Sequence, residues 1–108
     1  MSLSYHESFL KDLARHDTIF LEKEYPKLVQ AAEVHGYRGP SKKRHNGVVP
    51  IRPTDTNLLK QLTKLVKEHN ITDKFSPIKV VAHVPSGNRL IGVKYENGDI
   101  MILGVACY

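Results

Sequence analysis

The stretch GNRLIGVKYENGDIMILGVACY, residues 87–108, predicts two β-strands joined by a tight turn. Its Asn97-Gly98 pair lies between two apolar runs, which is the strongest short-range signal for a β-hairpin. Just before it, IKVVAHV (residues 78–84) is rich in β-branched side chains and predicts another strand, which ends at Pro85-Ser86-Gly87. Three successive strands of this kind predict an antiparallel β-meander.

Upstream of the meander, the apolar residues are spaced for helices. In DTNLLKQLTKLVKEHN, residues 55–70, they recur at i, i+1, i+4, i+7 and i+8 and therefore share one helix face. Pro26 and Gly36 have the positions expected just inside the start and just past the end of another helix. Ser4 and Glu7 form a capping box that predicts a helix from residue 5, although residues 3–7 are also consistent with a short edge strand.

These elements predict one domain, residues 1–108, because a chain of this length buries a single hydrophobic core. We expect an α+β fold in which N-terminal helices pack on a C-terminal three-stranded antiparallel β-meander. A short N-terminal edge strand is the alternative that the pattern leaves open.

The charge balance favours an acidic partner. Sixteen Lys and Arg against eleven Asp and Glu give a net charge of +5, and a basic domain of this kind is attracted to phosphates. We see neither an apolar run long enough to span a membrane nor a charged-then-apolar leader. The single cysteine, Cys107, excludes an internal disulfide and fits a reducing compartment. We therefore expect a cytoplasmic protein without membrane contact.

The positive charge is densest in YRGPSKKRHNGVVPIRPT, residues 37–54, whose proline and glycine content predicts a long loop. No acidic residue interrupts its cations, which predicts a nucleic-acid-binding loop that displaces counterions from phosphates; a solvated, flexible loop is the alternative. The cations are Arg38, Lys42, Lys43, Arg44 and Arg52.

His45 lies inside this cluster, where neighbouring cations favour its neutral form and make it a candidate general base. A surface histidine without a special role is the alternative. The six histidines lack the spacing of a metal site, and the chain has no phosphate-binding or dinucleotide-binding glycine motif. We therefore expect neither a metal nor a cofactor.

Arg89 begins a strand directly after a turn, and Lys94 follows on the same strand. An arginine on an otherwise apolar strand must reach solvent, a carboxylate or the phosphate of a ligand. Arg89 is therefore a candidate phosphate ligand, and Lys94 is a candidate nucleic-acid contact.

With Arg89-Leu90 opening one strand and Tyr108 closing the next, NRLIGVKYENGDIMILGVACY is similar to the C-terminal strands of the RelE/ParE toxin superfamily, in particular its ribosome-dependent branch that cleaves messenger RNA. YHESFLKDLARH resembles the opening of that family, a short strand followed by a helix. The resemblance implies that Arg89 holds the scissile phosphate, and that Tyr108 stacks on a base or takes part in proton transfer.

The activity implied by the resemblance is metal-independent cleavage of messenger RNA, with or without the ribosome, and an acidic antitoxin as the protein partner. Two alternatives remain open. One is a non-catalytic nucleic-acid- or protein-binding module of phage or plasmid type, which would use the 38–52 loop. The other is the gyrase-inhibiting branch of the same superfamily, which keeps the fold and loses the catalysis.

Overall fold

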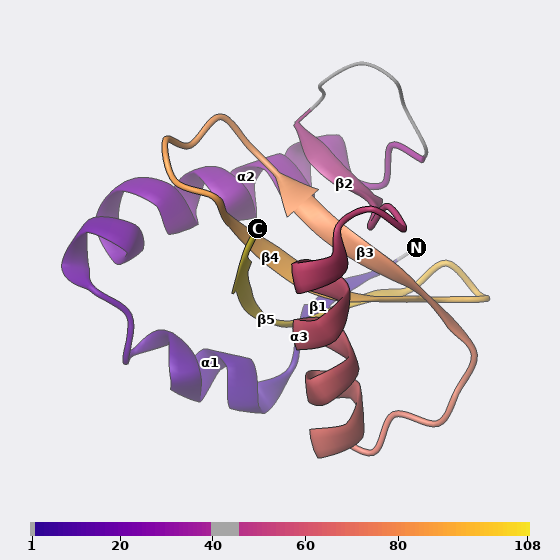
Figure 1. Ribbon diagram of the computed structural model, residues 1–108. Coiled ribbons are helices and arrows are strands. Elements are labelled where there is room, and N and C mark those ends of the chain that lie inside the picture. Colours follow the sequence, from indigo (N-terminus) through magenta and orange to yellow (C-terminus); the bar gives the residue numbers. More distant parts are fainter. Residues whose placement is uncertain (1, 40–45) are drawn as a thin grey trace.

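The computed structural model describes residues 2–39 and 46–108, which form a five-stranded sheet flanked by helices (Figure 1). The strands are β1 Leu3–Tyr5, β2 Gly47–Pro50, β3 Phe75–Val81, β4 Asn88–Tyr95 and β5 Ile100–Cys107. The helices are α1 Glu7–Leu13, α2 Tyr25–His35 and α3 Thr56–Glu68, and a π-helical turn, η1 Phe20–Glu24, leads into α2. None of the helices in the described ranges is long and apolar enough to cross a membrane.

The strand order is β1-β5-β4-β3-β2, and the sheet is mixed. Strands β2 to β5 pair antiparallel, whereas β1 pairs parallel with β5, so that Leu3 lies opposite Ile100. The sequence-based prediction of N-terminal helices packed on a three-stranded antiparallel meander was therefore wrong. It did not include β2, and it gave β1 only as the alternative of a short edge strand over residues 3–7, which the structure contains as Leu3–Tyr5. Strands of three and four residues are too short for a clear two-residue period, and the exposed edges of β5 and β3 supply their hydrogen-bond partners.

The two faces of the sheet carry separate hydrophobic cores. On the first face, Phe9 of α1, Phe20 of η1 and Leu28 of α2 pack on Leu90 and Ile102. On the second face, the apolar stripe of α3 packs on the residues Ile91, Val93, Leu103 and Ala106. We call these the α2 side and the α3 side of the sheet.

A β-bulge in β5 changes which side its side chains face. Ile91 pairs with Gly104 and the next residue, Gly92, pairs with Ile102, so Leu103 is an extra residue on β5. Ile102 therefore faces the α2 side while Ala106 faces the α3 side, although strict alternation would put both on the same face. Every side chain after the bulge, including that of Tyr108, is shifted to the opposite face.

Gly92 makes this close pairing possible. A Cβ atom added at position 92 would lie 2.1 Å from the carbonyl oxygen of Met101, which is backbone and cannot swing aside. The direction of the Tyr108 side chain therefore depends on a glycine in the neighbouring strand.

Candidate functional site

Arg89 and Tyr108, the two residues expected at the ends of the closing hairpin, come together on the α3 side. The Arg89 guanidinium carbon lies 5.1 Å from the centre of the Tyr108 ring. Arg89 pairs with Ala106 across the β4–β5 ladder, and the bulge directs Tyr108 to the same face. The contact is a cation–π pair at the end of the sheet where β4 begins and β5 ends.

Lys79 of β3 completes this arrangement. Its ammonium nitrogen donates a 2.8 Å hydrogen bond to the Tyr108 hydroxyl oxygen and lies 4.9 Å from the centre of the same ring. Only 6% of Lys79 is exposed, which is unusual for a lysine. The sequence analysis missed Lys79; a single lysine inside the apolar run IKVVAHV was the signal that could have identified it.

Asp55, just before α3, is the counter-ion of Lys79. Its carboxylate accepts a 2.8 Å hydrogen bond from Lys79 and a 3.1 Å hydrogen bond from the backbone N–H of Arg52. Burial acts to raise the pKa of Asp55, but these hydrogen bonds and the adjacent positive charges outweigh it and hold the pKa below its ordinary value. The Asp55 side chain is therefore a carboxylate at neutral pH. We call Asp55, Lys79, Arg89 and Tyr108 the Tyr108 site.

The turn before β4 holds one end of the Arg89 guanidinium. Its NH1 nitrogen donates to the carbonyl oxygens of Ser86, at 3.1 Å, and Asn88, at 2.6 Å. The Ser86 hydroxyl donates to the buried carboxylate of Glu24 at the end of η1, which fixes the turn. Both of these bonds come from NH1. The NH2 nitrogen has no hydrogen-bond partner within the described part of the chain.

Hydrogen bonds to the backbone of Tyr108 and of its neighbour Cys107 hold the end of β5, but Tyr108 remains 47% exposed. Its backbone N–H donates to the Gly87 carbonyl, and the Gln61 side chain of α3 donates to the carbonyl of Cys107. The result is a half-exposed phenol ring with two cations close to it, those of Lys79 and Arg89. Such an arrangement can bind a phosphate through the cations while the ring stacks on a base.

The other predicted site residues are spread more widely. Lys42, Lys43, Arg44 and His45 lie outside the described residues. Arg38 is exposed and bonds to the Asn46 carbonyl and the His35 ring. Arg52 is exposed one turn before α3, close to Asp55. Lys94 lies on the α2 side, 4.7 Å from the centre of the Tyr37 ring, so the structure does not bring Lys94 to Arg89.

A second polar cluster joins the start of α1 to the end of α3. The Ser8 hydroxyl lies between His6 Nδ1, at 2.8 Å, and His69 Nε2, at 3.0 Å, and the two imidazole rings stack with centres 4.1 Å apart. The Ser8 backbone N–H also donates to His6 Nδ1, so this nitrogen carries no proton. Burial and the neighbouring His69 lower the pKa of His6, against the opposite effect of Glu7.

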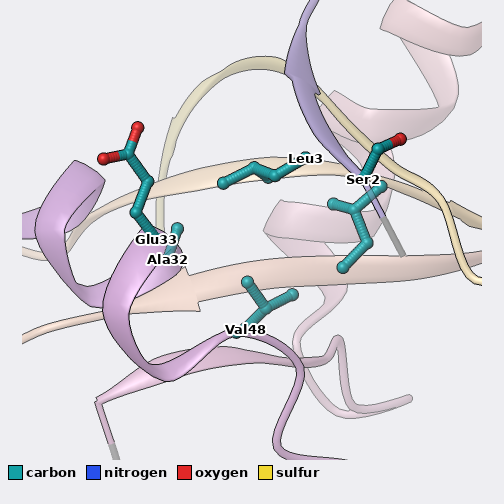
Figure 2. Close-up of a pocket in the computed structure, with 7 residues that line it drawn as sticks. Ser2, Leu3, Ala32, Glu33 and Val48 are labelled. Carbon is teal, nitrogen blue, oxygen red and sulfur yellow. The ribbon is translucent and has the colours of Figure 1, made fainter.

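A hollow of about 230 Å³ lies on the α2 side, between β1, α2 and β2 (Figure 2). Leu3 and Val48 project toward one another across it, and the Glu33 carboxylate points away from it at the rim. Its walls are mainly apolar and its nearest charge is negative, so it does not suit a phosphate. Within residues 2–39 and 46–108, no group of three or more His, Cys, Asp or Glu side chains could hold a metal ion.

No protein-family model matches the chain, and neither the curated proteins nor the solved structures that were searched contain a match.

Proposed function

We propose that this protein binds and cleaves RNA through the Tyr108 site, without a metal ion. The observation that carries the proposal is the meeting of Arg89, Lys79 and Tyr108 at one end of the sheet. A half-exposed tyrosine beside two cations offers both phosphate binding and proton transfer. The resemblance to the toxin superfamily supports messenger RNA as the substrate, on or off the ribosome, and an acidic antitoxin as partner.

In the proposed reaction the 2′-hydroxyl attacks the adjacent phosphorus. A general base takes the 2′ proton, the bond from phosphorus to the 5′-oxygen breaks, and an acid protonates that oxygen, leaving a 2′,3′-cyclic phosphate. The NH2 nitrogen of Arg89 and the ammonium of Lys79 stabilise the charge that develops on the phosphate. His45 is the base proposed from the sequence.

Tyr108 is the proposed acid. Its oxygen accepts the hydrogen bond from Lys79, so its own O–H is free to donate toward a substrate. The exposed part of the ring is available to a base next to the scissile phosphate.

The test is cleavage of a single-stranded RNA by the purified protein in the presence of a chelator, followed by analysis of the termini. We expect Tyr108→Phe and Arg89→Ala each to lower kcat by roughly 10²–10³-fold, the usual effect of losing one acid or one charge-stabilising donor. Tyr95→Phe is the matched control, because Tyr95 lies at the other end of β4, roughly 20 Å away. Full cleavage by Tyr108→Phe and Arg89→Ala, or no cleavage by the unmodified protein of either the free RNA or ribosome-bound messenger RNA, would refute the proposal.

A second candidate, a non-catalytic nucleic-acid-binding module, is favoured by the internal pairing of both cations. Lys79 is neutralised by Asp55, and the NH1 nitrogen of Arg89 already bonds to two carbonyls. This candidate predicts RNA binding that Arg89→Ala leaves intact and that neutralising Lys42, Lys43 and Arg44 abolishes. High-level expression in bacteria separates the two: the nuclease should arrest growth and Arg89→Ala and Tyr108→Phe should relieve the arrest, whereas the binding module should be harmless.

A further inference from the structure

The charge of the chain is divided between its two parts. Residues 1–36, which include α1, η1 and α2, carry four Lys and Arg against six Asp and Glu, whereas residues 37–108 carry twelve against five. The first set of helices covers the α2 side of the sheet, and α3 covers the opposite side. The net positive charge of the protein therefore belongs to the part that includes α3 and the Tyr108 site, an asymmetry typical of proteins that bind a polyanion.

Helix α3 presents a row of lysines on the face turned away from the sheet. Leu58 and Leu62 are buried beneath the helix, and Lys60, Lys64 and Lys67 are exposed at i, i+4 and i+7 on its outer face. With a rise of about 1.5 Å per residue, these lysines recur along about 10 Å of the helix. We call Lys60, Lys64 and Lys67 the lysine row.

The lysine row begins beside the Tyr108 site. Asp55, directly before α3, holds Lys79, and Gln61, next to Lys60, bonds to the carbonyl of Cys107. Figure 1 shows the first turn of α3 next to the C-terminal end of the chain. A strand bound along the outer face of α3 therefore reaches Tyr108 where the helix begins.

We propose that the lysine row holds the backbone of a single-stranded RNA and leads it to the Tyr108 site. The choice of RNA rests on the proposed function, while the position of the binding surface rests on the charge division and the geometry of α3. Each lysine that contacts a phosphate releases a counterion, so binding through the row depends on salt in proportion to the number of contacts.

The test measures binding of a fluorescent single-stranded RNA whose 2′ positions are all methylated, so that cleavage through a 2′-hydroxyl cannot occur. The variant Lys60→Gln/Lys64→Gln/Lys67→Gln should reduce the magnitude of the log–log salt slope by about 2, since each single-strand contact contributes about 0.7. The same relation gives roughly 100-fold weaker binding at about 0.1 M salt. Glutamine has nearly the helix propensity of lysine, and the urea midpoint of the variant verifies that α3 is intact.

The matched control is Lys11→Gln/Lys23→Gln/Lys27→Gln, which removes the same charge from α1, η1 and α2. We expect it to leave the salt slope unchanged. An equal loss in both triple variants, no loss in the α3 variant, or no binding by the unmodified protein would overturn the inference. The assignment to single-stranded RNA would be overturned if double-stranded DNA or polyglutamate bound more tightly than the RNA and lost as much affinity in the α3 variant.

These results are independent of catalysis. If the α3 variant binds weakly while Tyr108→Phe still cleaves unmethylated RNA, the RNA-binding role of the lysine row is supported and the proposed chemistry is refuted. If Tyr108→Phe stops cleavage while the α3 variant binds normally, the proposed chemistry is supported and the RNA-binding role of the lysine row is refuted.

Discussion

Removing the carboxylate of Asp55 should destabilise the protein far more than removing the lysine with which it pairs. The Asp55→Ala variant leaves the Lys79 ammonium in a site where the lysine is 6% exposed, with the Tyr108 hydroxyl as its remaining hydrogen-bond partner. Breaking a buried ion pair by removing one partner costs about 3–5 kcal/mol, because the other charge stays desolvated. The carboxylate lies near the surface here, so we expect a loss of about 3 kcal/mol in the free energy of unfolding.

The Lys79→Met variant should lose only about 1 kcal/mol, because methionine fills the buried volume without a charge and Asp55 keeps its bond from the Arg52 backbone. In the double variant Asp55→Ala/Lys79→Met, both charges of the Asp55–Lys79 pair are removed together, so neither is left buried without its partner. We therefore expect it to be about 2 kcal/mol more stable than Asp55→Ala alone.

Urea unfolding measures these differences, and thermal unfolding should show a fall in Tm of roughly 12 °C for Asp55→Ala. Glu96→Ala removes an exposed carboxylate in the hairpin turn and is the control, with an expected change below about 0.5 kcal/mol. The reasoning is refuted if Asp55→Ala behaves like this control, or if adding Lys79→Met fails to restore stability.

The pH dependence gives a second check on the same pair. The pKa of Asp55 is lower in the folded protein than in the unfolded chain, so its contribution is complete above the unfolded value of about 3.9 and is lost as the pH falls through the folded value. The stability gap between the unmodified protein and Asp55→Ala should therefore narrow on acidification below about pH 4.

Three further predictions follow from other parts of the structure. Gly92→Ala should cost about 1–3 kcal/mol in urea unfolding, because its Cβ would meet the Met101 carbonyl, and should also lower RNA cleavage by displacing Tyr108. Because the pKa of His6 is lowered in the folded state, stability should fall as the pH drops below about 6.5, and a His6→Gln variant measured by urea unfolding should lose this dependence. Glu24→Ala should weaken the Ser86 turn and raise amide hydrogen exchange in residues 86–88, whereas exchange in β3 stays unchanged.

The elements with a strong local pattern could be predicted from the sequence. The Asn97-Gly98 turn and the apolar stripe of residues 55–70 are both present, since a hairpin turn and an amphipathic helix depend mainly on neighbouring residues. β2 was not predicted, and β1 only as an alternative, because their pairing with β3 and β5 joins residues far apart in the chain.

The sequence alone identified Arg89 and Tyr108 as the ends of the closing hairpin and showed that the charge of the protein is positive. Only the tertiary structure decided that they meet. Without the bulge at Leu103, the two-residue period of β5 would direct Tyr108 to the α2 side, away from Arg89 and Lys79. One extra residue, accommodated by a glycine in the adjacent strand, reverses that direction, and a local pattern carries no signal for a shift in pairing between two strands.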